Sequence, residues 1–212
     1  RKASWSLSRF GLVSVGAQDA LRAPPDFLRD FIASAARCGA HRVRIADTVG
    51  LARPLQVAEM VRDLIPSAGR TALEFHGHND LGMATANTMS GLINGARQVE
   101  VTMNGIGERA GNTSLEEIAM ILKSRKHLNL VSNINARKIY RTSRLVSTLM
   151  RMPVQPNKAI VGRNAFAHSS GIHQDGVLKR RENYEIINPR TVGINESSIL
   201  LTAPSGRAAL KH

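Results

Sequence analysis

This sequence of 212 residues has a single cysteine and no long apolar run, which disfavours disulfide-stabilised and membrane-spanning proteins. Its single cysteine, Cys38, rules out an internal disulfide and favours an intracellular setting. No apolar run is long enough to span a bilayer, and the basic start RKASWSLSRFG lacks the apolar segment of a signal peptide. We therefore expect a cytoplasmic protein with no membrane partner.

Acidic residues are also scarce, so the formal net charge is +13. Such a charge can indicate nucleic-acid binding. However, basic residues cluster only at 137–144 and 179–181, and aromatic residues, which stack on bases, make up just 4% of the chain. No zinc-finger, RNA-recognition or KH signature is present. We expect no nucleic-acid partner, although salt-dependent binding to DNA or RNA would test this alternative.

The sequence does contain repeated strand–helix units. Strand-like runs begin near Leu12, Arg42, Ala72 and Gln98, and a helical pattern follows each of them at intervals of roughly thirty residues. Such spacing predicts an α/β fold with a parallel sheet, either doubly wound or a barrel. No G-x-G-x-x-G motif follows the first strand, which disfavours a dinucleotide-binding fold. A complete (β/α)8 barrel needs about 250 residues, so four units amount to half a barrel.

Polar residues follow the expected strands, and the third strand ends in the pair His76 and His78. Residues i and i+2 of a strand point to the same face, so both imidazoles can reach one cation. Imidazole together with oxygen donors suits a divalent metal ion. A histidine pair of this kind is also a frequent chance occurrence. The second polar motif, NGIGERAGN at 104–112, follows the next strand and makes chance a poorer explanation.

The stretch 74–117 resembles the family of acyl-CoA-condensing, lyase-type TIM barrels that includes 2-isopropylmalate synthase and homocitrate synthase. The family pattern HxHND-G-A-x-AN is matched from His76 to Asn87, and NGxGERAGN-x-x-LEE is matched from Asn104 to Glu117. The resemblance implies the last four units of a TIM barrel at 1–132. A small, mostly helical and irregular subdomain would follow at 133–212, where NKAIVGRNAFAHSSGIHQDG resembles the isopropylmalate synthase branch.

The resemblance also implies a set of site residues. His76 and His78 would be metal ligands, with Asn112 supplying an oxygen, and the metal would be Mn, Mg or Zn. Thr48 would contact the carboxylate of a 2-oxo acid, although a threonine there could equally be a helix N-cap.

The remaining residues of that set serve proton transfer and support. His173 and Tyr184 would act in acid–base chemistry, unless they are structural residues of an irregular subdomain. Asp80 is expected to orient a histidine. Glu108 and Arg109 are expected to pair with each other.

The reaction implied is a condensation of acetyl-CoA with 2-oxoisovalerate, or alternatively with 2-oxoglutarate. The surplus positive charge would then meet CoA phosphates or acidic residues of a missing portion. Two departures favour a third alternative, an inactive or regulatory half-barrel. The D-x-T-L-R-D-G-x-Q motif of the relatives is absent, and Gln18 stands where many relatives have a glutamate base. An active form would need a complementary N-terminal half-barrel, as a separate or missing portion, and a homodimer is expected.

Overall fold

The computed structural model describes residues 11–168, 186–194 and 198–199. The chain divides between Leu115 and Glu116 into two compact units, which are described separately below. The domain boundary expected after residue 132 stays a prediction.

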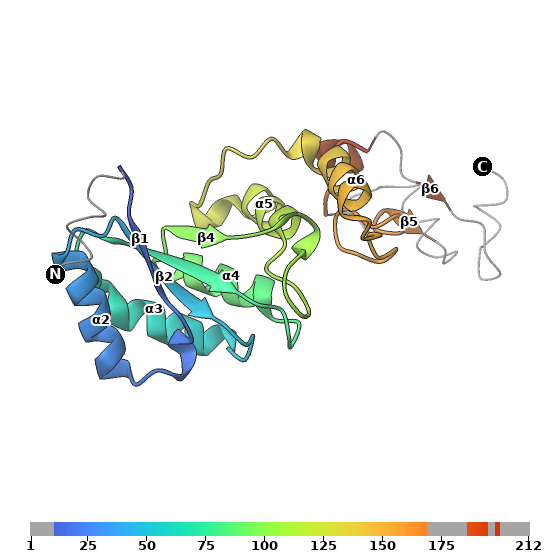
Figure 1. Ribbon diagram of the computed structural model, residues 1–212. Coiled ribbons are helices and arrows are strands. Elements are labelled where there is room, and N and C mark those ends of the chain that lie inside the picture. Colours follow the sequence, from blue (N-terminus) through green and yellow to red (C-terminus); the bar gives the residue numbers. More distant parts are fainter. Residues whose placement is uncertain (1–10, 169–185, 195–197, 200–212) are drawn as a thin grey trace. The chain divides into compact units, whose positions relative to one another are not determined.

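The first unit is built on a four-stranded parallel sheet with the strand order β1-β2-β3-β4 (Figure 1). The strands are β1 (Ser14–Ala17), β2 (Arg42–Asp47), β3 (Ala72–Gly77) and β4 (Gln98–Glu100). Each strand pairs with the next one in the sequence. The predicted repeat of βα units is therefore confirmed, and all four carboxyl ends lie along one edge of the sheet.

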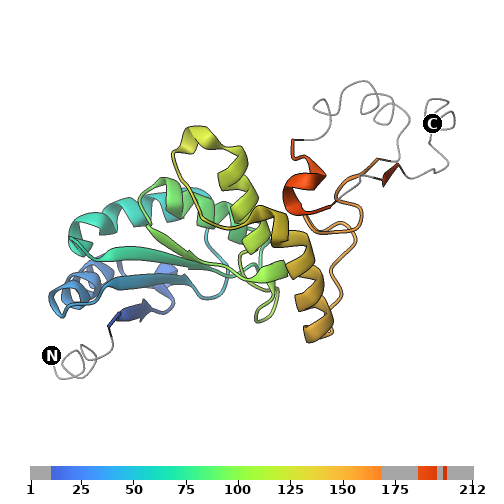
Figure 2. The same ribbon diagram turned by 90° about the horizontal axis from the view of Figure 1, so that it is seen from above.

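Three helices lie side by side on one face of this sheet (Figure 2). They are α2 (Pro25–Arg37), α3 (Pro54–Ala68) and α4 (Ala84–Ile93). Helices α2 and α3 each begin with a proline, where the missing N–H has no intrahelical partner to lose. Gly39 and Gly95 follow α2 and α4 with φ of 87° and 116°, a left-handed conformation that favours glycine.

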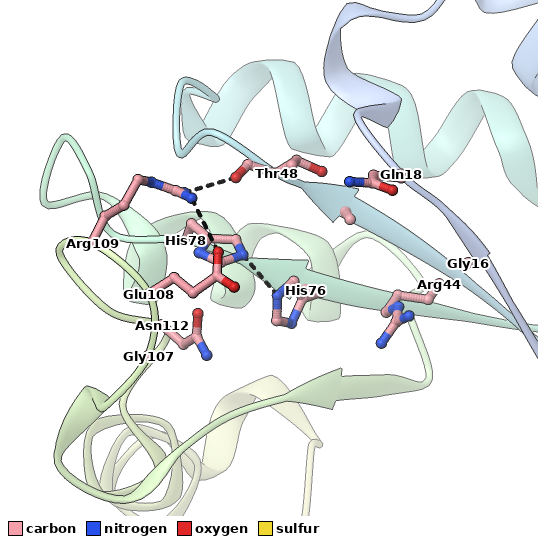
Figure 3. Close-up of a pocket in the computed structure, with 11 residues that line it drawn as sticks. Gly16, Gln18, Arg44, Thr48, His76, His78, Gly107, Glu108, Arg109 and Asn112 are labelled. Carbon is pink, nitrogen blue, oxygen red and sulfur yellow. Dashed lines mark hydrogen bonds and ion pairs between the residues drawn. The ribbon is translucent and has the colours of Figure 1, made fainter.

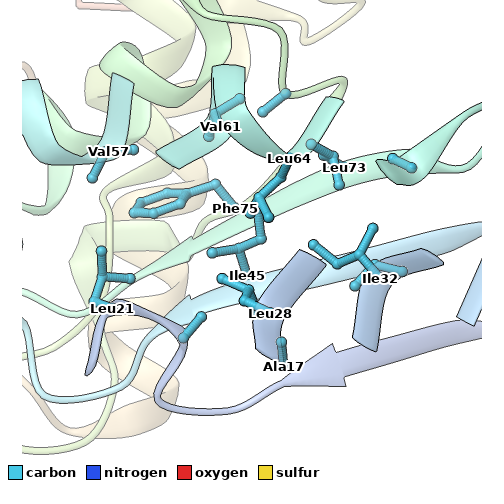
Figure 4. Packing of buried hydrophobic residues seen from close by; sticks show 14 of the residues in the cluster. Ala17, Leu21, Leu28, Ile32, Ile45, Val57, Val61, Leu64, Leu73 and Phe75 are labelled. Atoms are coloured by element: carbon cyan, nitrogen blue, oxygen red, sulfur yellow. The ribbon is translucent and has the colours of Figure 1, made fainter. Parts of the chain in front are cut away.

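The hydrophobic core lies between these helices and the strands (Figure 4). Alternate strand residues point toward the helices, and among them Val43, Ile45, Leu73 and Phe75 are buried. Helix residues such as Val61 complete the cluster. One face of the sheet is thus a packed apolar layer that holds the strands rigidly.

The opposite face of the sheet is polar. Its residues include Arg44 on β2, Glu74 on β3 and Glu100 on β4. Gln98 donates a hydrogen bond of 2.7 Å from Nε2 to Glu74 Oε1. Within the described residues, β1 and β4 are edge strands with one neighbour each. A polar inner face and two unpaired edges are what a segment of a barrel wall presents.

The second unit is mostly helical. Its elements are α5 (Leu115–Ser124, which starts at the last residue of the first unit), η3 (Lys126–Leu128), η4 (Ala136–Lys138), α6 (Ile139–Met150), β5 (Ala167–His168), η6 (Pro189–Val192) and β6 (Ser198–Ile199). Lys158 forms ion pairs with Glu116 and Glu117. Arg144 donates a hydrogen bond to the Val161 carbonyl and lies over the ring of Tyr140. Within the described ranges, no helix combines the length and the apolar character needed to cross a membrane.

Phe75 is the side chain on which the stability of the first unit should depend most. It is fully buried at 0% exposure, and a Cβ added at Gly91 in α4 would lie 3.5 Å from its Cβ and Cγ atoms. We expect Phe75→Ala to lower the free energy of unfolding by about 3–5 kcal/mol. Phe27→Ala, at a phenylalanine of α2 that is 60% exposed, is the matched control and should cost less than about 1 kcal/mol. Urea denaturation followed by circular dichroism measures both; equal losses would contradict the assigned core.

Candidate functional site

A cavity of about 630 Å3 opens at the carboxyl ends of the strands (Figure 3). Its walls come from the polar face of the sheet and from the loop that follows β4. The lining residues are Gly16, Gln18, Arg44, Ala46, Thr48, His76, His78, Gly107, Glu108, Arg109 and Asn112. The cavity therefore collects the polar residues that follow four separate strands in the sequence.

His76 and His78 converge inside this cavity. His76 lies on β3 and His78 follows it with one residue between, so both side chains leave the same face. Their Nε2 atoms are 3.0 Å apart, and the rings meet edge to face at an interplanar angle of 81°. The structure brings together the two rings that the sequence placed on one face.

Burial disfavours the charged form of the His76 ring. Burial lowers the pKa of His76 below its ordinary value, and the Glu100 carboxylate acts in the opposite direction. Glu100 Oε2 lies 2.8 Å from His76 Nδ1, a short contact that is not aligned as a hydrogen bond. Arg44 Nη1 donates to both oxygens of Glu100, at 2.9 and 3.1 Å. A neutral imidazole is the form that binds a metal ion.

Asn112 is placed beside these rings by the loop after β4. A backbone bridge joins it to His78, and its own N–H donates to the Gly105 carbonyl at 3.0 Å. The side-chain Oδ1 of Asn112 is buried and has no hydrogen-bond partner in the described structure. A buried acceptor without a donor is costly, so an oxygen in this state is a candidate ligand atom.

Glycines in the loop 104–112 allow close contacts within the loop that a larger residue would block. A Cβ at Gly107 would lie 2.6–2.8 Å from the amide atoms of Asn112. A Cβ at Gly111, which has a φ of 91°, would lie 2.0 Å from the carbonyl oxygen of Gly105. At these glycines the loop therefore approaches the Asn112 amide and its own backbone closely.

Asp80 pairs with Arg109, whereas the sequence led us to expect a contact with a histidine. Arg109 Nε donates to Asp80 Oδ1 at 2.7 Å and its Nη2 donates to Oδ2 at 2.9 Å. These hydrogen bonds lower the pKa of Asp80. The expected contact of Arg109 with Glu108 is also present, at 3.6 Å. Since a bidentate pair directs the guanidinium strongly, Asp80 orients Arg109 rather than an imidazole.

Thr48 lines the cavity and links two loops. Its Oγ1 accepts a hydrogen bond of 2.8 Å from the backbone N–H of Asp19, and its carbonyl accepts one of 2.8 Å from Arg109 Nη2. The alternative that Thr48 caps the following helix is wrong, because the N-cap residue of α3 is Arg53. The hydroxyl proton of Thr48 can still be donated to a carboxylate. Its role as a substrate contact stays a prediction.

Asp47, just before Thr48, has a structural role. Its fully buried carboxylate accepts hydrogen bonds from the backbone N–H groups of Leu51 and Ala52, at 3.0 and 3.2 Å. Burial raises the pKa of Asp47, and these two hydrogen bonds offset part of that effect. Asp47 therefore closes the loop between β2 and α3.

The side chains of His76, His78 and Asn112 provide part of a binding site for a divalent metal ion. With metal–nitrogen bonds of about 2.1 Å, two ligands of one ion lie roughly 2.9–3.4 Å apart, and the observed separation of the Nε2 atoms is 3.0 Å. Asn112 Oδ1 would add an oxygen donor. Among the described residues, no group of three His, Cys, Asp or Glu side chains gathers around one point, so an anionic ligand would come from elsewhere.

Arg44, which lines the cavity, and Glu100, which contacts His76 beside it, were not identified from the sequence. Both lie inside strands, where single charged residues read as solvent-facing positions. The signal that could have found them is their alternation with apolar neighbours, which places both on the same face as His76. Gln18, noted as a departure from the relatives, does line the cavity. His173 and Tyr184 lie outside the described residues, so their roles stay predictions.

Fold and site together define a class of protein: a fragment of a parallel βα barrel with an imidazole-containing polar cavity at the carboxyl ends of its strands. Residues 2–146 match the HMGL-like family, and residues 160–212 match the family described as homocitrate synthase post-HMGL domain-like. The chain belongs to the HMGL-like family.

Relatives with curated names are similar over nearly the whole chain. A 2-isopropylmalate synthase of Parabacteroides distasonis is 58% identical over 198 residues, which are 92% of this chain and 40% of that protein. One of Carboxydothermus hydrogenoformans is 55% identical over 204 residues, which are 94% of this chain and 40% of that protein. The chain thus spans about 40% of the length of these relatives.

Solved structures share the fold at low sequence identity. Hydroxymethylglutaryl-CoA lyase of Pseudomonas aeruginosa superposes with a TM-score of 0.64 at 15% identity, covering 72% of this chain and 54% of that one. The HMG-CoA lyase of Bacillus subtilis gives 0.63 at 18% identity, covering 77% and 56%. Because each likeness takes in about half of the other chain, the prediction of a TIM-barrel fragment is confirmed.

Arg109 should hold the glycine loop against the strand ends. Replacing it with methionine removes its bonds to Asp80 and to the Thr48 carbonyl. We expect Arg109→Met to speed amide hydrogen exchange at 105–112 by about tenfold, because local opening of the loop becomes easier.

The matched control is Arg29→Met. Arg29 also pairs with two aspartates, Asp26 and Asp63, but lies on α2. Arg29→Met should leave amide hydrogen exchange at 105–112 unchanged. Hydrogen–deuterium exchange read by NMR distinguishes the two variants, and similar exchange in both would show that Arg109 does not hold the loop.

Proposed function

We propose that this chain forms part of a 2-isopropylmalate synthase, which condenses acetyl-CoA with 2-oxoisovalerate to give 2-isopropylmalate and CoA in leucine biosynthesis. The observation that carries the proposal is the convergence of His76, His78 and the unpartnered Asn112 Oδ1 in one cavity. The relatives named 2-isopropylmalate synthase, at up to 58% identity among those given above, support it.

In this proposal the two imidazoles and the Asn112 oxygen hold a divalent ion, Mn, Mg or Zn. When bound there, such an ion polarises the keto group of the 2-oxo acid as a Lewis acid. Thr48 donates its hydroxyl proton to the carboxylate of the same substrate and so orients the keto group toward the histidines. Gln18 has no ionisable group, so it cannot accept the α-proton of the acetyl group.

Proton transfer is assigned to His173 and Tyr184, by their resemblance to the family's acid–base residues. The water that hydrolyses the thioester supplies the hydroxyl of the new carboxyl group, and CoA leaves with a proton. The surplus of basic residues would attract the CoA phosphates from solution. A complementary half-barrel, a homodimer and a cytoplasmic location complete the proposal.

Metal binding tests the first step of this proposal directly. We expect purified protein to bind Mn2+ or Zn2+ and His78→Ala to weaken that binding by at least tenfold, because one of two imidazole ligands is lost. His127→Ala, at an exposed histidine of η3, is the matched control and should bind the ion as the parent does. Isothermal titration measures both affinities. Equal affinities in the two variants would remove the histidine pair from the metal site.

Activity tests the reaction itself. In the described part of the chain, β1 and β4 each have one neighbouring strand, and no three His, Cys, Asp or Glu side chains gather around one point. We expect the lone chain to release no CoA from acetyl-CoA and 2-oxoisovalerate. We expect it to release CoA once it is mixed with the N-terminal portion of the Parabacteroides distasonis relative. CoA release by the lone chain would contradict the need for a complementary half. No release after assembly into a folded complex would favour an inactive or regulatory half-barrel.

The alternative substrate is 2-oxoglutarate, as in a homocitrate synthase. The match of residues 160–212 to the family described as homocitrate synthase post-HMGL domain-like is the observation that keeps it open. Parallel assays of the assembled protein with the two 2-oxo acids decide between them. We expect a higher kcat/KM for 2-oxoisovalerate, and the reverse ratio would transfer the assignment to the alternative.

A further inference from the structure

The strand register places Glu100 directly beside His76. The two residues are paired in the parallel ladder between β3 and β4, and they leave the sheet on the same face. On the other side of β3, Arg44 of β2 is paired with Glu74, which lies two residues before His76. Three neighbouring strands thus bring a cation, a carboxylate and an imidazole together beside the cavity.

The carboxylate of Glu100 is fixed from two directions. Arg44 Nη1 donates to both of its oxygens, and Oε2 also lies 2.8 Å from His76 Nδ1. Gly16, the partner of Arg44 in β1, leaves the guanidinium room, since a Cβ there would lie 3.0 Å from Arg44 Nη2. The position of the carboxylate is therefore set by the sheet and does not depend on a bound ligand.

This contact decides which nitrogen of His76 carries the proton. A carboxylate oxygen at 2.8 Å from an unprotonated Nδ1 would set two lone pairs against each other. A proton on Nδ1 turns the same contact into an attraction, whatever its alignment. A neutral imidazole with its proton on Nδ1 has its bare lone pair on Nε2, which is the atom that faces His78.

We propose that Glu100 is a positioning residue that, anchored by Arg44, holds the proton of His76 on Nδ1 and presents Nε2 to the cavity as a ready metal ligand. The two histidines are then unequal. With Nε2 of His76 as acceptor at 3.0 Å, Nε2 of His78 must be the donor. His78 Nδ1 is buried and has no hydrogen-bond partner in the described structure, so no contact fixes the proton of His78 in the same way. His76 is preorganised, and His78 must move its proton before it can bind a metal ion.

Long-range 1H–15N correlation NMR of the neutral rings, at about pH 8, tests this directly. In the parent protein, His76 should show a protonated Nδ1 and a bare Nε2, and His78 should show the opposite pattern. Glu100→Gln places an amide, which can also donate, beside Nδ1 and should shift most of His76 to the Nε2-protonated form. Arg44→Met, which keeps the carboxylate but removes its anchor, should give a partial shift.

Glu74→Gln is the matched control. Glu74 lies two residues before His76 on the same strand and accepts from Ser14 and Gln98 instead of an imidazole. Glu74→Gln should leave the tautomers of His76 and His78 as they are in the parent protein. A parent His76 protonated on Nε2, or a His76 that keeps its Nδ1 proton in folded Glu100→Gln, would overturn the proposal.

Metal affinity is the second readout, and it rests on the proposed function. We expect Glu100→Gln to weaken Mn2+ or Zn2+ binding 10- to 100-fold, as the loss of carboxylate partners of metal-bound histidines typically does. Unchanged affinity would contradict the positioning role. If the parent binds neither ion, the proposed function fails, while the tautomers measured by NMR still decide whether Glu100 sets the proton of His76.

Discussion

The pairing of β3 with β4, in which His76 lies opposite Glu100, is the constraint on which the site depends. Side chains alternate along a strand, so this register puts His76 and Glu100 on the face that bears the cavity and Phe75 in the core. A shift of one residue would bury a histidine against the helices and expose the phenylalanine. The burial of Phe75 therefore also selects the orientation of the histidine next to it.

The site is shared between rigid and adjustable parts of the first unit. The strands hold His76, Arg44 and Glu100 through a sheet whose other face is closely packed. Asn112 reaches the same cavity on a loop, which is held by backbone hydrogen bonds to Gly105 and to the segment after β3. Arg109 ties that loop to Asp80. Strand β3 thus fixes His76, and the loop after β4 brings in the Asn112 oxygen.

Much of this arrangement was predictable from the sequence. The βα repeat and the shared face of His76 and His78 follow from periodicity, and the family resemblance implied that Asn112 lies with them. The position of Glu100 did not follow, because it depends on the register between strands about twenty-five residues apart. The Asp80–Arg109 pair was missed for a similar reason: two loops have to meet in space before either partner can be assigned.

Two features of the helices do not follow from local sequence patterns. Helix α3 continues through Pro66 and ends at Ala68. Leu145 and Leu149 of α6 are 57% and 72% exposed, although apolar residues recur along this helix at helical spacing. Helical periodicity reports a face that can be buried, and tertiary structure decides whether it is.

We propose that the imidazoles of His76 and His78 bind one divalent ion. X-ray absorption spectroscopy of the zinc-loaded protein measures this most directly, because imidazole rings give characteristic outer-shell scattering. We expect two imidazoles whose nitrogen atoms lie about 2.0–2.1 Å from zinc. A spectrum with no imidazole, or with only one, would contradict it.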